Sequence, residues 1–192
     1  GEQVRNMGTL GGNIANGSPI GDMAPILIAL RAGIILIKDG VRRSILVEEF
    51  FLEYGKQDLG SGEFIEKIFI PIDTEIDFYA YKLSKRRDED ITIVSVAISV
   101  KTEDYQIKSP IIVFGGMAGT PKRSLAAENV VEGRKLDGLT VKLAGLALEE
   151  DFTPMTDARA SADYRILVAK NLLKKFCLEY ESQHPVTIKR EI

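Results

Sequence analysis

The chain has 192 residues, of which 45% are hydrophobic and 28% are charged, and this balance excludes a wholly disordered polypeptide. Its 25 basic and 28 acidic residues give a net charge of -3, so nucleic acid is not an expected partner. A single cysteine, Cys177, and a single histidine, His184, exclude a disulfide framework, an iron–sulfur cluster held by this chain alone, and a zinc site without carboxylates.

We expect no signal peptide at the start of the given sequence, because residues 1–5 are largely polar and no apolar segment follows them directly. The longest apolar runs, 26–30 and 34–37, fall far short of the roughly 20 residues that a membrane helix needs. We therefore expect a cytoplasmic protein without a membrane partner. The chain lacks an initiator methionine and begins close to a dense motif, so we also expect a fragment whose N-terminal part lies outside it.

Glycines crowd the start of the chain: eight of the 17 fall in residues 1–40, and five of those lie within 8–21. We predict a loop over 5–22. In Gly8-Thr9-Leu10-Gly11-Gly12-Asn13, consecutive glycines favour positive φ and close approach of the backbone to a ligand, so successive N–H groups could form a nest that binds an anion. A tight turn without a ligand explains the same residues equally well.

The first part of the chain then alternates helical and strand patterns. In chain order we predict a helix over 23–31, a strand over 33–37, its hairpin partner over 43–46, a helical turn at 48–51 and a strand over 63–70. Asp39-Gly40 favours the type I′ turn of that hairpin. Asp22 has two interpretations: it caps the helix after it, or it accepts hydrogen bonds from a ribose or an adenine. We place a boundary near 72–77.

The second part predicts an antiparallel meander followed by helices, which makes the whole chain an α+β protein. We expect three strands, over 78–83, 91–101 and 107–114, and helices at about 122–132, 139–149 and 161–181. Apolar residues at steps of three or four mark the last helix most clearly, and Ser161 is its expected N-cap.

Charged residues in this second part each have a structural and a functional interpretation. Lys82 either points its ammonium into a site or is an exposed lysine on a strand, and Lys85–Asp90 is either a solvated loop or a lid over a ligand. Arg159, Asp163 and Arg165 predict an ion-pair network at a helix start. Cys177 is expected to be a helix residue without chemistry. Because the only histidine lies in the tail, no Ser-His-Asp set is expected.

Four collinear segments spread over about residues 3–177 together resemble the flavoprotein part of the molybdenum hydroxylases. They are VRNMGTLGGNIANGSPIGDMAPILIAL, FYAYKLSKRRDEDITIVSVAISV, FGGMAGTPKRS and FTPMTDARASADYR. This likeness is far more specific than one glycine-rich loop. It implies that 1–73 form the second lobe of a two-lobed FAD-binding domain of the vanillyl-alcohol-oxidase type, whose N-terminal lobe is missing. Residues 74–183 would form the C-terminal flavoprotein domain, a three-stranded antiparallel sheet packed on helices, and 184–192 a tail.

The resemblance also implies a set of FAD-binding residues but no catalytic residue and no metal ligand. Thr9 would bind phosphate with Gly11, Gly12 and Asn13 beside it, Asp22 would meet the adenosine, Ile65 would touch the cofactor through its backbone, and Lys82 would lie at the flavin. Ser18 belongs to the stretch 16–22, whose many side-chain donors and chain-breaking residues indicate a ligand-facing loop. The Lys85–Asp90 segment would border the flavin and its access for NAD+. A first glycine-rich loop is absent, so only half of the FAD contacts are expected here.

By the same resemblance, FAD relays electrons from [2Fe-2S] clusters to NAD+, while a molybdopterin centre in another subunit hydroxylates a purine. The expected partners are therefore an iron–sulfur domain and a molybdopterin subunit, and the expected enzyme is a xanthine dehydrogenase. Two alternatives stay open. One is the flavoprotein of a related carbon monoxide, nicotinate or aromatic acyl-CoA oxidoreductase. The other is an interaction scaffold that keeps the fold without the flavin.

Overall fold

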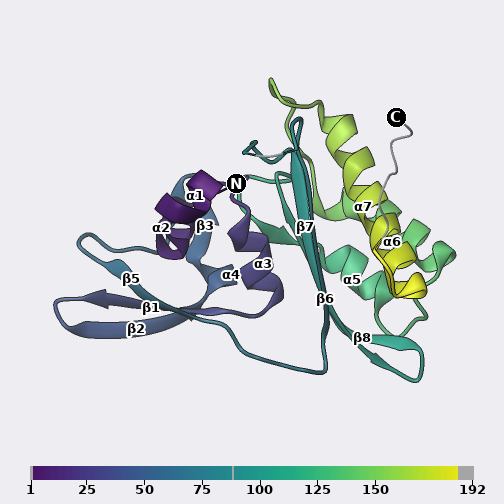
Figure 1. Ribbon diagram of the computed structural model, residues 1–192, viewed down its shortest axis with the longest axis horizontal. Helices are drawn as coiled ribbons and strands as arrows, with labels where there is room; N and C mark the ends of the chain where they lie inside the picture. The colour runs from purple at the N-terminus through teal and green to yellow at the C-terminus, as the bar shows by residue number, and fades with distance from the viewer. Residues whose placement is uncertain (1, 88, 186–192) are drawn as a thin grey trace.

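The computed structural model describes residues 2–87 and 89–185 and builds them around a four-stranded antiparallel sheet (Figure 1). The first part of the chain contains α1 (Glu2–Met7), α2 (Leu10–Ala15), α3 (Met23–Ala29), β1 (Gly33–Lys38), β2 (Val41–Leu46), α4 (Val47–Phe50), β3 (Phe51–Glu53), β4 (Lys56–Gln57) and β5 (Phe64–Phe69). The second contains β6 (Asp77–Leu83), β7 (Val94–Glu103), β8 (Gln106–Gly115), β9 (Lys122–Arg123), α5 (Leu125–Val131), α6 (Gly138–Asp151) and α7 (Ala162–Ser182).

The central strands of the sheet β6-β7-β8-β9 are buried on both faces. On one face, Ala97, Ile111 and Val113 pack into the core of the first part, against α3. On the other, residues such as Ile98 and Phe114 pack into the core formed with α5, α6 and α7. A strand covered on both sides needs apolar residues at nearly every position, which explains the unbroken apolar run of β7. Strands β7 and β8 therefore contribute to the hydrophobic cores of both parts of the chain.

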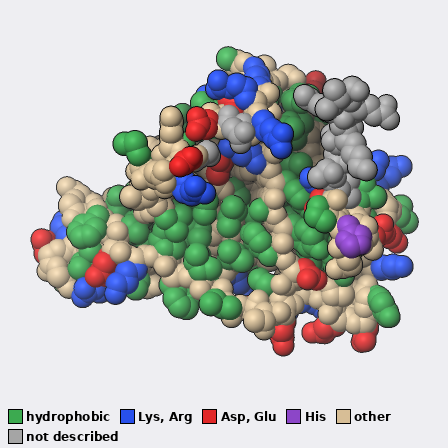
Figure 2. All heavy atoms as spheres, in the orientation of Figure 1, with side chains coloured by type: hydrophobic (Ala, Val, Ile, Leu, Met, Phe, Trp, Pro, Cys, Tyr) green, Lys and Arg blue, Asp and Glu red, His purple; other side chains and the backbone are tan. Residues whose placement is uncertain are grey.

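The first part has its own three-stranded antiparallel sheet, in the order β2-β1-β5. Ile34 and Leu36 of β1 are fully buried on the side that carries α2, α3 and α4, as Figure 1 shows for the helices. The opposite side of this sheet is open, and Phe64 and Phe69 of β5 are exposed there. Figure 2 shows a broad area of hydrophobic side chains across the middle of one face of the molecule.

Several predictions of secondary structure are confirmed. Asp39 and Gly40 have positive φ (50° and 80°) and join β1 to β2 in register, as the Asp-Gly turn predicts. The hydroxyl of Ser161 accepts a hydrogen bond from the Tyr164 N–H, so it caps α7. The expected α+β architecture is present, with one addition: the two-residue strand β9 makes the predicted three-stranded sheet four-stranded.

The predicted loop over 5–22 is wrong in its first half, because α1 and α2 are helical. Gly11 and Gly12 lie inside α2, and Gly17 is the glycine with positive φ in the described part of this stretch. Glycine lowers helix propensity by up to about 1 kcal/mol per residue, which favours a loop in any reading of the sequence alone. Burial of Ile14 and the cap supplied by Thr9 stabilise the helix nevertheless.

Arg43 of β2 binds two carboxylates of the segment before β5 and so connects these two parts of the chain. The Arg43 guanidinium donates to both oxygens of Glu63, at 2.7 Å each, and to Asp58 at 2.6 Å. Hydrogen bonds from Arg43 and from the Gly60 N–H lower the pKa of Glu63 to about 2. The ionised carboxylate is thus favoured by folding, which links stability to pH.

We expect the free energy of unfolding to fall as the pH drops from about 4.5 towards 2, because Glu63 must then be protonated and loses its bonds to Arg43. A Glu63→Gln variant should be less stable at neutral pH and show a shallower fall over the same interval. Thermal unfolding followed at stepped pH measures both. Glu103→Gln, at an exposed strand end, is the control and should keep the wild-type slope. A Glu63→Gln curve parallel to the wild-type curve would contradict the linkage.

Candidate functional site

The first element of the candidate site is the start of α2. Thr9 is its N-cap: its hydroxyl oxygen accepts the Gly12 N–H at 3.0 Å, so its own proton stays available for a ligand. The N–H groups of Leu10 and Gly11 precede the first hydrogen bond of the helix and have no acceptor within it. Because Gly11 and Gly12 have no side chains to cover them, these N–H donors stay accessible. The start of α2 can therefore donate several hydrogen bonds to an anionic group.

Ile65 and the turn of residues 18–21 lie beside this helix. A Cβ placed on Gly11 would be 3.9 Å from Cγ2 of Ile65, so β5 runs next to the glycines of α2. A Cβ placed on Gly21 would be 3.6 Å from the side-chain oxygen of Asn13. Ser18 closes the turn, since its carbonyl accepts the Gly21 N–H at 3.0 Å. The structure thus brings the predicted residues from α2, the turn and β5 together.

Asp22 and Lys82 form the next element, although 60 residues separate them. The Lys82 ammonium donates to the Asp22 carboxylate at 2.6 Å, and the Thr92 hydroxyl donates to the second Asp22 oxygen. Asp22 precedes α3 but makes no side-chain hydrogen bond to the helix, so the capping prediction is wrong. Its carboxylate is used by Lys82 and Thr92 instead. The resemblance places Asp22 at the adenosine and Lys82 at the flavin, whereas the structure puts both side chains in one place.

Next to this ion pair is a pocket of about 220 Å³ between α3 and the sheet, lined by Asp22, Pro25, Ile26, Ala80, Tyr81, Lys82, Ser95 and Val96. Lys82, Ser95 and Gly115 are paired across β6, β7 and β8 and therefore share the face that α3 covers. Ser95 is 5% exposed, and its hydroxyl has no hydrogen-bond partner among the described residues. A Cβ at Gly115 would lie 2.5 Å from that hydroxyl and 3.1 Å from Pro25, so only glycine allows this close packing.

Two buried serines of β7 allow a test of this description. Ser95→Ala removes a hydroxyl without a partner, so we expect the free energy of unfolding to stay the same or to rise by up to about 1 kcal/mol. Ser99→Ala removes a hydrogen bond from the hydroxyl to the Ala29 carbonyl, 2.7 Å long, and should lower the same quantity by about 1 kcal/mol. Chemical denaturation measures both. Equal losses in the two variants would show that Ser95 has a partner.

These features fit a dinucleotide cofactor such as FAD. Backbone donors and the Thr9 hydroxyl at α2 suit the pyrophosphate. The site continues from α2, Ile65 and residues 18–21 to a buried hydroxyl without a partner, at Ser95, and to a pocket with charges of both signs, at Asp22 and Lys82. We call this set of residues the strip. The strip joins the two parts of the chain, because the Gly116 N–H donates to the Pro19 carbonyl at 2.8 Å. This contact brings the end of β8, at Gly115-Gly116, close to the backbone of the turn before α3.

The charged segment 85–90, of which residue 88 lies outside the described residues, contains an internal ion pair between Arg86 and Asp90. Arg86 bonds to the Asp90 carboxylate through its backbone N–H at 2.7 Å and its guanidinium at 3.3 Å. Lys85 reaches the Ala158 carbonyl at 3.3 Å, which ties the segment to the chain before α7. These contacts agree with the interpretation of the segment as a solvated loop. A role of the segment as a lid over a ligand stays a prediction.

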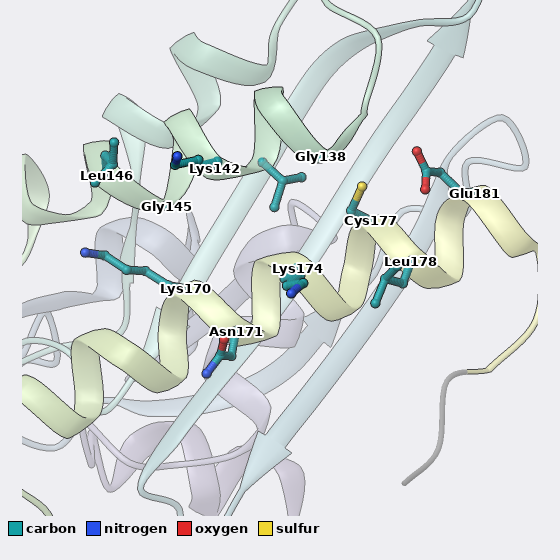
Figure 3. Close-up of a pocket in the computed structure, with 11 residues that line it drawn as sticks. Gly138, Lys142, Gly145, Leu146, Lys170, Asn171, Lys174, Cys177, Leu178 and Glu181 are labelled. Carbon is teal, nitrogen blue, oxygen red and sulfur yellow. The ribbon is translucent and has the colours of Figure 1, made fainter.

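A second pocket, of about 390 Å³, lies between α6 and α7, away from this strip (Figure 3). Leu146 and Leu178 contribute apolar surface, and the Cys177 thiol faces the space between the two helices. Burial raises the pKa of Cys177 to about 11, so the thiol stays protonated at neutral pH. It is therefore a poor nucleophile, in keeping with the expectation of a helix residue without chemistry.

The sequence missed three residues that border the strip. Thr92 and Ser95 are hydroxyl residues inside an apolar strand run, and this interruption is the signal that could have identified them. Arg165 was expected only in an ion-pair network; it does pair with Asp157, at 2.9 Å, and Arg159 lies 3.9 Å from the same carboxylate. The third expected member, Asp163, takes no part in an ion pair in the described part of the chain.

Comparison with known proteins assigns a family to this arrangement. Residues 79–180 match the family model of the CO dehydrogenase flavoprotein C-terminal domain, and residues 1–73 match that of the FAD binding domain in molybdopterin dehydrogenase. The glyceraldehyde dehydrogenase medium chain of Sulfolobus acidocaldarius is 36% identical over 90% of this chain and 61% of its own length. The xanthine dehydrogenase of Dictyostelium discoideum is 36% identical over 61% of this chain and 10% of its own.

Solved structures agree with this assignment. The carbon monoxide dehydrogenase of Hydrogenophaga pseudoflava has a chain with a TM-score of 0.84 and 28% identity, which covers 91% of this chain and 61% of that one. Fold and matching segments together define an FAD-binding flavoprotein of mixed α and β architecture. The chain belongs to the flavoprotein family of the molybdenum hydroxylases. It spans about three fifths of the length of the medium-chain relatives that it matches.

One further property concerns membranes. Within residues 2–87 and 89–185, none of the helices combines the length and the apolar composition that crossing a lipid bilayer requires.

Proposed function

We propose that the chain binds FAD along the strip from α2 to Lys82 and takes part in electron transfer within a molybdenum hydroxylase. When bound, FAD supplies the ability to accept and pass on electrons. The observation that carries the proposal is the convergence of α2, the 18–22 turn and the Asp22–Lys82 pair, from two separate segments, beside a buried hydroxyl without a partner. The family match supports the same cofactor.

In this proposal, Thr9, Gly11, Gly12 and Asn13 hold the pyrophosphate, with Ser18 and Ile65 alongside. Because the Asp22 and Lys82 side chains touch, they face the same part of the cofactor. We assign them to the flavin end, where the Lys82 ammonium would stabilise negative charge and Asp22 would hold it in place. The pair would be presented by rigid elements, a strand and a helix start, which favours a fixed orientation of the charge.

The proposal also names the enzyme of which the chain is a part. We propose a cytoplasmic xanthine dehydrogenase with NAD+ as electron acceptor, whose iron–sulfur domain and molybdopterin subunit are the partners. The relatives named xanthine dehydrogenase support this choice. A second candidate, an aldehyde dehydrogenase of the same family, is favoured by the glyceraldehyde dehydrogenase relative, which matches 90% of this chain.

Spectroscopy and turnover of the purified enzyme that contains this chain test the proposal in two stages. The visible absorbance of a flavin should be present, and xanthine should reduce it in the assembled complex, with NAD+ restoring the oxidised spectrum. Reduction by glyceraldehyde but not by xanthine would select the second candidate, and nicotinate or carbon monoxide would select a related enzyme. An enzyme that releases no FAD on denaturation and that added FAD does not reconstitute would reject the flavoprotein proposal and leave the scaffold.

A further inference from the structure

Arg165 is a buried cation that reaches the candidate site from the opposite side of the sheet. It lies in the first turn of α7 and is only 2% exposed. One guanidinium nitrogen, Nη1, donates to the Ile93 carbonyl at 2.5 Å and to the Gly116 carbonyl at 3.0 Å. The other, Nη2, donates to both oxygens of Asp157 at 2.9 Å. One side chain therefore holds three separate segments.

Both carbonyls lie where the β7–β8 ladder ends. Ser95 and Gly115 are the last pair of that ladder, and no further β7–β8 pair follows it in the described part of the chain. Ile93 and Gly116 lie just past the pair, so Arg165 replaces the missing ladder contacts and fixes the distance between the strand ends. Gly116 has φ of 79°, and its position against the Ile93 carbonyl leaves no space for a side chain. The arrangement is built closely around one guanidinium.

Each of the two carbonyls that Arg165 binds belongs to a residue that is linked to the candidate site by one peptide bond or one hydrogen bond. Ile93 follows Thr92, whose hydroxyl donates to Asp22. Gly116 donates its own N–H to the Pro19 carbonyl, within the turn that leads into Asp22. A shift of either segment would therefore move the Asp22 carboxylate, and Lys82 with it.

The counter-ion of Arg165 stays charged at working pH. Burial acts to raise the pKa of Asp157, but the N–H groups of Ala160 and Arg159 and the Arg165 guanidinium outweigh it and hold the pKa at about 2. The pair thus keeps its geometry across neutral pH. A buried ion pair adds little net stability compared with apolar packing, so its distinctive property is the defined geometry that it imposes.

Resting on the proposed function, we propose that Arg165 is a positioning residue for the FAD site. It acts through Ile93 and Gly116 to place Asp22 and Lys82, and it does not touch the cofactor. A planar guanidinium with several fixed donors can hold two carbonyls and a carboxylate at once, which a lysine ammonium cannot do with the same geometry.

The test compares Arg165→Met, Arg165→Lys and Asp157→Asn in the purified enzyme that contains this chain. Glu128→Gln is the matched control. Glu128 is also buried, pairs with Arg123 at 2.6 Å and holds the Ile112 N–H at 2.8 Å in the same sheet. Two quantities are measured for each variant: the Kd for FAD, by flavin fluorescence during titration, and the melting temperature of the apoprotein.

We expect Arg165→Met to raise the Kd for FAD on the order of tenfold, with Arg165→Lys and Asp157→Asn in between. Glu128→Gln should lower the melting temperature but leave the Kd within about twofold of wild type. In an Asp22→Asn background, Arg165→Met should have little further effect on the Kd, because its influence passes through Asp22.

Three results would overturn the inference. Arg165 and Asp157 variants could keep the wild-type Kd, Glu128→Gln could weaken FAD binding as much as they do, or the effects of Arg165→Met and Asp22→Asn could simply add. In each case wild-type FAD binding would leave the proposed function intact. A wild-type enzyme without FAD would reject the proposed function itself, and this inference with it.

Discussion

Replacing Gly116 by alanine is expected to lower the free energy of unfolding by more than about 2 kcal/mol. Two effects add at this position. The φ of 79° lies in the left-handed region, which disfavours any residue with a Cβ. That Cβ would also lie 2.3 Å from the Ile93 carbonyl oxygen, and because this is backbone it cannot rotate away. Chemical denaturation of the variant and the wild type measures the difference.

Gly138→Ala is the matched control for this experiment. Gly138 is the first residue of α6, and a Cβ there would meet no atom within 4 Å. Alanine is a better helix residue than glycine, so we expect the control to be unchanged or up to about 1 kcal/mol more stable. A Gly116→Ala protein as stable as the control would show that the turn after β8 rearranges without cost.

Removing either partner of the Asp22–Lys82 pair is expected to weaken FAD binding by roughly 10- to 100-fold, the effect of losing one charge-assisted hydrogen bond. The changes are Lys82→Met and Asp22→Asn in the enzyme that contains this chain, and the measurements are its FAD content and, under the proposed function, its rate of NAD+ reduction. Both partners are partly exposed, so we expect the fold itself to tolerate the changes.

Lys101→Met supplies the control for charge loss on the same sheet. Lys101 lies towards the other end of β7 and pairs with Asp73 at 2.9 Å and Glu75 at 3.0 Å. It should keep the wild-type content of FAD. Full FAD content together with full NAD+ reduction in Lys82→Met would end the proposed role of Lys82.

Local sequence signals predicted those parts of the fold that depend on neighbouring residues. The Asp39-Gly40 turn, the Ser161 cap and the long apolar face of α7 each arise within a few positions along the chain. Helix α2 could not be predicted in this way, since its glycines disfavour a helix and the packing of Ile14 against the core, together with the Thr9 cap, offsets them. The strand β9 has two residues, which is too short for any periodicity.

The residues of the candidate site divide in the same way, into those that a local motif identifies and those that only tertiary packing brings together. Its α2 residues are close together in sequence and carry a recognisable motif, so the resemblance could assign them. The contact between Asp22 and Lys82 depends instead on how α3 crosses the sheet, which no local pattern determines. Capping was the natural expectation for an aspartate before a helix, and it failed because Lys82 and Thr92 compete for the same carboxylate oxygens.

The doubly covered strands β7 and β8 also matter for anyone who produces pieces of this protein. The sequence suggests a cut near residue 73, between two modules that look separate in the sequence alone. Such a cut would uncover Ala97, Ile111 and Val113 on one piece and the α3 side of the other core on its partner. Newly exposed apolar surface of this kind favours aggregation. We therefore expect each half expressed alone to be poorly behaved, and co-expression of the two halves to restore a stable, non-covalent pair.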